Sequence, residues 1–454
     1  MRAISIISAL LLLTGCGDGE ARLRRLLQQT SGTVDLPAGE FELSSELAVP
    51  DGARDLEIRG AGSGTLLRAS AKFNGRAMLR LGRGAGVRIT GVSFDGNREA
   101  LEKRAGLPPS DVPFARHFSG SGILADQVQG LSISDVAFRN IAGFAILVSR
   151  SSNVVIHGAE IRDSGSRNEK GRNNTTGGIL LEEGVASFEV RYSVLRDIRG
   201  NGIWTHSNYG SPRNRDGVVA RNRFWNIGRD AIQIGHAVNV RIEDNVGTRI
   251  GYPVDEVDTE GGGTPVGIDT AGNVENSVYA GNRFEEINGK CIDLDGFHHG
   301  EVRGNTCVNR GAAADYPFGH YGIVFNNANP DMESTGILVS ENTIDGTKFG
   351  GIFVIGRRHR IAGNTLRNLN LAGCNESAAV YGCSHFPGEP DLLQAGIYLG
   401  RGAERPALAR DNVIEANEIS GHKMSSRCVL AAPGVSLAAN RVAGNRCADS
   451  SEGR

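Results

Sequence analysis

The chain is poor in aromatic residues, which make up 6% of its 454 residues, and it has only 14 prolines and no low-complexity tract. This composition argues against disorder. The formal net charge of −2 provides no basic surface, so we expect no nucleic-acid partner. Beyond the first residues there is no long apolar run, so we expect nothing after the N-terminus to enter a membrane. Glycine is abundant, with 63 residues, which favours many tight turns joining short strands.

The first residues form a targeting segment rather than part of a fold. Arg2 precedes the apolar stretch 3–13, which is too short to span a bilayer as a helix. The sequence Leu13-Thr14-Gly15-Cys16 resembles a bacterial lipobox, which implies a signal peptide over residues 1–15 and lipidation of Cys16. We therefore expect an exported protein that contacts the membrane only through its lipid. Gly17 after the cysteine favours the outer membrane and periplasm of a Gram-negative cell.

From about residue 86 one unit recurs: a short apolar strand that opens with a small residue and Ile, a turn, a β-branched strand, and an Asn. The openings are Gly122-Ile123, Ala145-Ile146, Gly178-Ile179, Gly202-Ile203, Ala231-Ile232, Gly267-Ile268, Cys291-Ile292, Gly322-Ile323, Gly351-Ile352, Gly396-Ile397 and Cys428-Val429. The Asn positions are Asn222, Asn282, Asn305, Asn342, Asn364, Asn417 and Asn445, each followed two residues later by an apolar residue or Cys. An Asn at a turn can bond the backbone of its neighbours, so we assign these residues a structural role.

The shortest repeats, such as Ile179 to Ile203 and Ile268 to Ile292, span 24 residues. This is too short for a strand-helix-strand unit of roughly 30 residues. It fits one coil of a β-helix, in which inward apolar side chains stack on those of the next coil, about 4.8 Å away.

With this repeat, the chain resembles the pectate-lyase-like right-handed β-helix superfamily, from about Gly32 to Cys447. The resemblance implies an all-β fold, a single right-handed parallel β-helix domain over residues 32–450 with about ten or more coils. Residues 16–31 are expected to form a tether and a short amphipathic capping helix, with Leu23, Leu26 and Leu27 covering the open end of the stack. The superfamily contains lyases, hydrolases, esterases, epimerases and non-enzymatic binders, so it does not fix the reaction.

If each repeat Ile points inward, the next residue points outward. This column reads Leu124, Leu147, Leu180, Trp204, Gln233, Asp269, Asp293, Val324, Phe353 and Tyr398. Insertions before and after the same strand are expected to wall a groove for an extended polymer. They are residues 165–176, 207–216, 251–265, 310–320, 327–335 and 370–393.

Asp269 and Asp293 should stack on adjacent coils, with Asp295 diagonal to Asp269. Their β-carbons would be about 5 Å apart in the direct pair and roughly 7–8 Å in the diagonal pair. Two carboxylates this close cannot both ionise freely, so one could act as a general acid while another activates water. The direct spacing is near that of retaining glycosidases and the diagonal spacing near that of inverting ones. Polygalacturonase-like members of the superfamily also use clustered Asp, but their Asn-Thr-Asp and Gly-His-Gly motifs are absent here.

The first hypothesis is therefore a glycoside hydrolase that cleaves an extracellular or periplasmic polysaccharide. The second is a polysaccharide lyase or epimerase with Lys290, Arg303 or a histidine as base, and with Ca²⁺ held by Asp269, Asp293 and Asp295. The third is a non-catalytic polysaccharide-binding surface protein. No cofactor other than this Ca²⁺ is predicted, and we expect a monomer.

His298 is a candidate proton shuttle because the ordinary pKa of a histidine lies near neutrality. The candidate substrate-binding residues are Trp204, His206, Asp230, Gln233, His236, His299 and Arg303. The Trp204 ring could stack on a sugar or pack beneath the loop 207–216. The acidic insertion at 255–260 is expected to be solvated and to repel a polyanion, which favours neutral sugars.

Six cysteines follow Cys16. Cys291 and Cys428 each precede an inward residue, and Cys307 and Cys447 each lie two residues after a repeat Asn. This shared register predicts disulfides Cys291–Cys307 and Cys428–Cys447, with Cys374–Cys383 as a third bridge within a loop.

Overall fold

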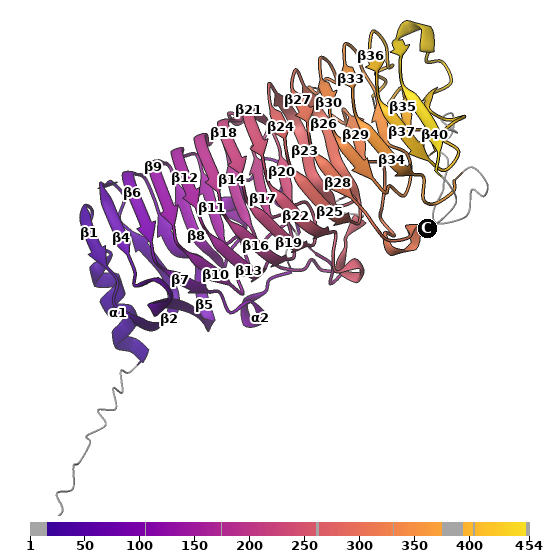
Figure 1. Ribbon diagram of the computed structural model, residues 1–454. Coiled ribbons are helices and arrows are strands. Elements are labelled where there is room, and N and C mark those ends of the chain that lie inside the picture. The colour runs from indigo at the N-terminus through magenta and orange to yellow at the C-terminus, as the bar shows by residue number, and fades with distance from the viewer. Residues whose placement is uncertain are drawn as a thin grey trace, which may run out of the picture.

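The computed structural model describes residues 16–104, 106–173, 175–259, 263–329, 331–374, 394–402 and 405–450. In these residues the chain winds into a parallel β-helix, in which each strand pairs in parallel with the strand one coil away. Figure 1 shows the coils stacked along one axis, from the indigo N-terminus to the yellow C-terminus. The predicted all-β solenoid is therefore confirmed.

The first sheet carries the predicted outward column. It starts with the ends of the long strands β2 (Gly39–Val49) and β5 (Thr65–Leu81), which also open the third sheet. It continues with β8 (Ser121–Asp126), β11 (Ile146–Ser149), β14 (Ile179–Glu182), β17 (Ile203–His206), β20 (Ile232–Ile234), β23 (Val266–Glu275), β26 (Lys290–His298), β29 (Ile323–Asn326), β32 (Ile352–Val354), β35 (Ile397–Leu399) and β38 (Val429–Ala431).

The second and third sheets complete each coil. The second sheet contains β1 (Gly32–Asp35), β3 (Ala53–Arg54), β4 (Leu56–Arg59), β6 (Gly84–Thr90), β9 (Val128–Ser134), β12 (Ser152–His157), β15 (Ala186–Arg191), β18 (Asn214–Ala220), β21 (Ala237–Glu243), β24 (Val278–Ala280), β27 (Glu301–Arg303), β30 (Leu338–Ser340), β33 (Arg360–Ala362), β36 (Val413–Glu415) and β39 (Arg441–Ala443). The third contains β7 (Ser93–Asp95), β10 (Ala137–Arg139), β13 (Glu160–Ser164), β16 (Val194–Ile198), β19 (Arg223–Ile227), β22 (Val246–Ile250), β25 (Arg283–Ile287), β28 (Thr306–Val308), β31 (Thr343–Asp345), β34 (Thr365–Leu369), β37 (Glu418–Gly421) and β40 (Arg446–Asp449).

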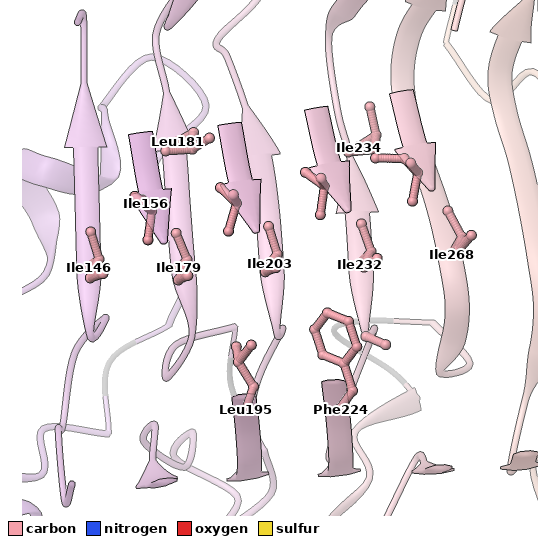
Figure 2. Packing of buried hydrophobic residues seen from close by; sticks show 14 of the residues in the cluster. Ile146, Ile156, Ile179, Leu181, Leu195, Ile203, Phe224, Ile232, Ile234 and Ile268 are labelled. Atoms are coloured by element: carbon pink, nitrogen blue, oxygen red, sulfur yellow. The ribbon is translucent and has the colours of Figure 1, made fainter. Parts of the chain in front are cut away.

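The core lies inside the coils and is built from stacked aliphatic side chains. Figure 2 shows Ile146, Ile179, Ile203, Ile232 and Ile268 in one row, each from a successive strand of the first sheet. All five are buried. Because these residues alternate with outward ones along each strand, the repeat Ile fixes which side chains face solvent.

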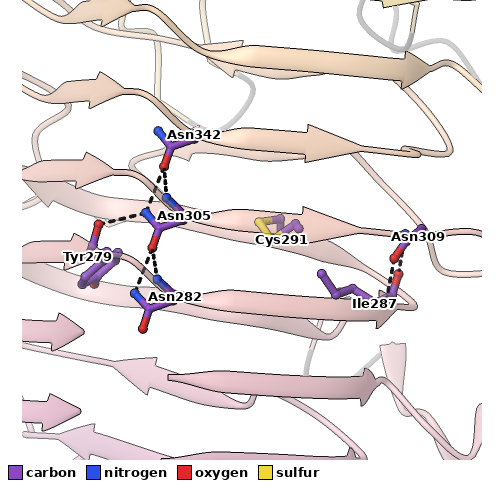
Figure 3. Close-up of a disulfide and its surroundings, with 8 residues drawn as sticks. Tyr279, Asn282, Ile287, Cys291, Asn305, Asn309 and Asn342 are labelled. Atoms are coloured by element: carbon purple, nitrogen blue, oxygen red, sulfur yellow. Dashed lines mark hydrogen bonds between the residues drawn. A yellow bond between two sulfur atoms is a disulfide. The ribbon is translucent and has the colours of Figure 1, made fainter. Parts of the chain in front are cut away.

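The repeat asparagines form a continuous hydrogen-bonded column at one turn. The side-chain oxygen of Asn305 accepts from the backbone N–H and the side-chain amide of Asn282, at 3.0 and 2.9 Å. The Asn305 amide donates in turn to the Tyr279 carbonyl and to Asn342, both at 2.9 Å. Figure 3 shows this column, which satisfies buried backbone groups from coil to coil. The predicted structural role of these asparagines is confirmed.

The N-terminal end of the stack is capped by α1 (Cys16–Leu26). Leu23 and Leu27 are buried in the core and Leu26 packs against it, as predicted. The Arg24 guanidinium fixes the helix through the carbonyls of Ser45 and Glu46, at 3.0 and 2.8 Å.

Two predicted disulfides are present. Cys291–Cys307 and Cys428–Cys447 have Cα–Cα separations of 6.0 and 5.7 Å. Cys307 stacks one coil above Phe284, the register from which the first pair is predicted. Cys383, in the predicted third pair, lies outside the described residues.

One insertion was not predicted. Residues 96–120 leave the third sheet, form α2 (Arg98–Leu101) and α3 (Phe114–His117), and return to β8. Figure 1 shows α2 at the lower edge of the solenoid, where the chain passes from the third sheet to the first.

Candidate active site

Gln233, Asp269 and Asp293 lie side by side on β20, β23 and β26. Gln233 is the register partner of Asp269, and Ile268 is the partner of Ile292, which sets Asp269 beside Asp293. The two Ile side chains lie in the core, so both Asp side chains point away from it. The predicted stacking on adjacent coils is confirmed, with a strand spacing of about 4.8 Å.

A chain of hydrogen bonds holds the polar groups in place. The Gln233 amide donates to Asp269 Oδ2 at 2.7 Å, and Gln233 Oε1 accepts from Asn201 at 2.6 Å. Asp230 joins through its backbone N–H, which donates to Asn201 Oδ1 at 3.3 Å. Its own Oδ1 accepts from the Val266 N–H at 3.0 Å. Asp230, Gln233, Asp269, Lys290 and Asp293 are called the carboxylate cluster below.

Lys290 supplies the cluster with a positive charge. Its ammonium group donates to Asp293 Oδ2 in an ion pair. Asp293 Oδ1 is buried and has no hydrogen-bond partner among the described residues. Asp269 and Asp293 are 9% and 6% exposed. They are therefore more buried than expected for residues that line an open groove. The carboxylates are therefore largely shielded from water. In such an environment of low dielectric constant, interactions between charges are stronger than in water.

The environment separates the proton affinities of these groups. Burial, followed by the charges of Asp230 and Asp293, raises the pKa of Asp269 well above its usual range. Burial raises the pKa of Asp230 to about 6. Lys290 is also buried, which alone would lower its pKa. The nearby Asp293 carboxylate outweighs this effect and leaves the Lys290 pKa above its usual value. The surroundings therefore favour the charged form of Lys290 and the protonated form of Asp269.

Asp295 stands slightly apart from this cluster. It lies between Ala271 and Asn326 on the neighbouring strands, and its Oδ1 accepts from the Ala328 N–H at 2.8 Å. The carboxylates of Asp269, Asp293 and Asp295 do not form one of the converging ligand groups found among the described residues. Because Ca²⁺ requires several converging oxygen ligands, this donor set does not fit the predicted Ca²⁺ site.

Trp204 is covered and does not present an open face to a sugar. Its ring is 6% exposed and packs edge-on against Phe114, at 4.8 Å between centroids. The covering residues come from the unpredicted insertion 96–120, not from the predicted loop 207–216. The outward residues Leu124, Leu147 and Leu180 are buried in the same apolar cluster.

The other side of the carboxylate cluster is covered in the same way. Val324 and Tyr398 are buried in a second apolar cluster, to which the insertion 310–320 contributes Ala313. Phe353 packs against this cluster. Along the outward column of the first sheet, the carboxylate cluster thus lies between two groups of apolar residues, and both groups are covered by other parts of the chain.

Three predicted histidines gather at the far end of β23 and β26. His298 Nε2 lies 3.0 Å from Asn273 Oδ1, and the Nδ1 atoms of His298 and His299 are 2.9 Å apart. The backbone N–H of Asn273 donates to His236 Nδ1 at 3.4 Å. Between Asp293 and His298 the chain bends at Gly296, which has a φ of 83°, and passes from the first sheet to the second. The structure therefore separates these histidines from the carboxylate cluster, contrary to the proton-shuttle role proposed for His298.

Two further candidates also lie elsewhere. Arg303 is on β27 in the second sheet, is exposed, and pairs with Glu301, so it does not join the Asp residues as predicted. His206 lies beneath Phe114, at 5.0 Å between ring centroids. Burial lowers the pKa of His206 to about 4, and its Nδ1 has no partner among the described residues.

The acidic insertion is not a free solvated loop. Glu256 pairs with Arg167, and Asp258 accepts from the Asn168 amide at 2.6 Å. The insertions 165–176 and 251–265 therefore contact each other through these pairs. Because Glu256 is paired with an arginine, the structure does not support the expected repulsion of polyanions.

Sequence reasoning missed His320 and Asn201. Burial, then the positive charges of Lys290 and Lys348, lower the pKa of His320 to about 3, so this ring is neutral beside the cluster. Its Nδ1 has no partner among the described residues. Both residues lie in the turn just before a strand of the first sheet. The residue type at this turn does not recur from coil to coil, so the repeat does not identify them.

A family model described as right-handed beta helix region matches residues 55–214 and 213–371 of this chain. No curated protein matches.

Solved structures with the same fold include three from bacteria. PfbA, a surface adhesin of Streptococcus pneumoniae, has a TM-score of 0.54 and 13% identity over 78% of this chain and 87% of that one. DFA-IIIase from Arthrobacter chlorophenolicus A6 has a TM-score of 0.51 and 12% identity over 93% and 92%. The catalytic unit of the GH87 alpha-1,3-glucanase from Streptomyces thermodiastaticus strain HF3-3 has a TM-score of 0.51 and 12% identity over 95% and 66%.

The chain also spans 55% of the length of a Geobacillus virus E2 protein, ORF18, with a TM-score of 0.50. At these identities the similarities establish the fold alone.

Proposed function

This chain belongs to the right-handed β-helix family, and we propose that it is a carbohydrate-active enzyme, a glycoside hydrolase that cleaves a polysaccharide at the carboxylate cluster. The observation that supports this function is that two carboxyl groups with different surroundings, Asp269 and Asp293, lie side by side on adjacent strands of the first sheet. Asp269 has a raised pKa, while its neighbour Asp293 is paired with a lysine. Two carboxyl groups in contrasting environments are what an acid and its partner require in glycoside hydrolysis.

Asp269 is the proposed general acid. Its pKa is raised by burial and by the charges of Asp230 and Asp293, so it keeps its proton to higher pH than an ordinary carboxyl group and can give it to the leaving-group oxygen. The amide of Gln233 donates to Oδ2 of this group, which leaves Oδ1 to carry the proton. The charge of Asp230 contributes to the raised pKa of Asp269. Burial raises the pKa of Asp230 itself to about 6.

Asp293 is the proposed nucleophile. Lys290 pairs with its Oδ2, while Oδ1 is left without a partner among the described residues and is the atom that would attack the sugar. Side chains on directly adjacent strands are about 5 Å apart, which is the spacing of retaining glycosidases. We therefore expect the anomeric configuration to be retained, and NMR of the first-formed product measures it.

The test is a panel of neutral and acidic polysaccharides, read for new reducing ends and for ultraviolet absorbance of unsaturated sugars. A hydrolase produces reducing ends without unsaturated products. Asp269→Asn and Asp293→Asn are each expected to lower the rate on the order of 100-fold or more. Asp126→Asn is the matched control, because Asp126 is an outward carboxylate of the same sheet that pairs with Arg150, remote from the cluster. Activity of either cluster variant within tenfold of wild type would refute the assignment.

The same assay addresses the two alternatives. Lys290 does not suit the role of lyase base, because its pKa is raised and the ammonium is held by Asp293. Unsaturated products would nevertheless establish a lyase. Retention of a polysaccharide in affinity electrophoresis, without any cleavage product, would establish a binding protein.

We further propose that the protein is exported and lipid-anchored through Cys16, and that it is a monomer. The signal peptide lies outside the described residues, and α1 starts at the cysteine that would carry the lipid. None of the helices among the described residues is long and apolar enough to cross a membrane. Metabolic labelling with a fatty acid, lost in Cys16→Ser, tests the anchor, and light scattering of the delipidated protein tests the monomer.

A further inference from the structure

Glu275, His298 and His299 meet outside the coils, at the end of β26. Glu275 on β23 is the register partner of His298 on β26, so the two side chains come from adjacent coils. Val274 and Phe297, which precede them, lie in the core, so Glu275 and His298 point outward. His299 follows with a φ of 50°, a left-handed conformation that is uncommon for a residue with a side chain. This bend brings the His299 ring beside that of His298.

The ring nitrogens are oriented by groups around them. Asn273 Oδ1 accepts from Arg213 Nη1 at 2.9 Å, which identifies this atom as the amide oxygen. His298 Nε2 lies 3.0 Å from the same oxygen and therefore donates its proton to it. In the neutral imidazole, Nδ1 then carries a lone pair, and this atom faces His299 Nδ1. A histidine that donates one ring N–H to a fixed acceptor and presents the other nitrogen is arranged as metal-binding histidines are.

We propose that Glu275, His298 and His299 bind one divalent transition-metal ion of the Zn²⁺ type. One ligand atom from each residue lies within 4.8 Å of the other two. Around a tetrahedral ion with bonds of about 2.0–2.1 Å, such atoms are about 3.3 Å apart, so small side-chain movements complete the site. Two imidazoles and one carboxylate select zinc-like ions over Ca²⁺ or Mg²⁺, which prefer oxygen ligands.

The ion would join neighbouring coils where the first sheet turns into the second. Arg213 also contacts Glu275, at 3.1 Å between Nη2 and Oε2, and so orients the carboxylate while leaving Oε1 for the ion. When the ion binds, the His299 proton moves from Nδ1 to Nε2, so both Nδ1 lone pairs are available. The site is distinct from the carboxylate cluster, because β26 passes from the first sheet to the second between Asp293 and His298.

The experiment measures Zn²⁺ binding by the metal-free full chain, in competition with a chromophoric chelator, with Co²⁺ absorption as a second readout. We expect one Zn²⁺ per chain and the visible d–d bands of a tetrahedral Co²⁺ complex. His299→Ala is the principal variant because His299 is exposed and its loss spares the core. His299→Ala, His298→Ala and Glu275→Gln should each weaken binding at least about tenfold, and Asn273→Ala on the order of tenfold.

His157→Ala is the matched control, since His157 is an exposed histidine on β12. His206→Ala is a second control, because His206 converges with Glu182 and Glu183 in a separate group. Neither control should change the affinity or the Co²⁺ spectrum. Failure of the wild-type chain to bind Zn²⁺ would overturn the proposal, as would undiminished affinity in both His298→Ala and His299→Ala. Loss of binding in His206→Ala alone would assign the metal to the other group and would equally overturn it.

Discussion

Glu182 gives a prediction in which a single group controls how stability depends on pH. Its side chain is buried beneath the insertion 96–120 and accepts the backbone N–H groups of Phe114 and Ala115, at 2.8 and 2.9 Å. These N–H groups belong to the first residues of α3, so a carboxylate from β14 caps this helix. Burial is the largest influence on Glu182 and raises its pKa from 4.5 to about 7.

The sign follows from this shift. Because the folded-state pKa lies above the unfolded value, the folded protein binds the Glu182 proton more tightly than the unfolded chain does. The contribution of Glu182 to stability is complete below pH 4.5 and is lost as the pH rises towards 7. At 1.36 kcal/mol per pKa unit, the loss is about 3 kcal/mol.

The perturbation is Glu182→Gln, which is neutral at every pH. The difference in unfolding free energy, wild type minus variant, should fall by about 3 kcal/mol between pH 4.5 and pH 7.5. The assay is urea unfolding across this range. Glu189→Gln is the control, because Glu189 is an exposed carboxylate on the next strand, β15. Any constant offset from the lost hydrogen bond cancels in the slope. A wild-type-minus-variant difference that is flat across this range would refute the reasoning.

Three further predictions concern other parts of the molecule. The double substitution Cys291→Ser and Cys307→Ser opens a loop of 16 residues and should lower the unfolding free energy by about 3 kcal/mol, measured by urea unfolding without reductant, and an unchanged free energy would contradict a stabilising bridge. Asn305→Ala removes side-chain bonds to three buried partners and should cost roughly 3 kcal/mol in the same assay, whereas a loss below about 1 kcal/mol would contradict the structural role of the column. Lys290→Met removes the cation that lowers the pKa of Asp269, so the basic limb of the pH–rate profile should move to higher pH, and an unshifted limb would count against Asp269 as the acid.

The repeat made most of the fold predictable. A small residue followed by Ile recurs once per coil, and alternation along a strand then fixes the outward neighbour, which is how Asp269 and Asp293 could be paired before any coordinates. The disulfide Cys291–Cys307 was predictable for the same reason, because both cysteines hold fixed positions within their coils.

The parts that lack periodicity were not predictable. Phe114 lies in an insertion without a repeat, so its contact with Trp204 leaves no pattern in the sequence. Arg303 was expected near the carboxylates because it follows them along the same coil. Instead β26 runs on to His298, and Arg303 falls in the second sheet. The length of a strand through a corner depends on tertiary pairing rather than on local sequence.

The position of the carboxylate cluster is itself an argument for function. Along one ladder, apolar outward residues are covered by Phe114 and its neighbours on one side and by Tyr321 and Phe349 on the other. Between these two apolar groups, the outward residues of the first sheet are polar: Gln233, Asp269 and Asp293. Apolar residues at these positions would extend the same packing. Burying carboxyl groups at adjacent positions costs stability unless they are paired, and the ion pair of Lys290 is with Asp293. A solenoid that needed only stability would continue its apolar outward column, so the polar residues at these positions support the proposed function.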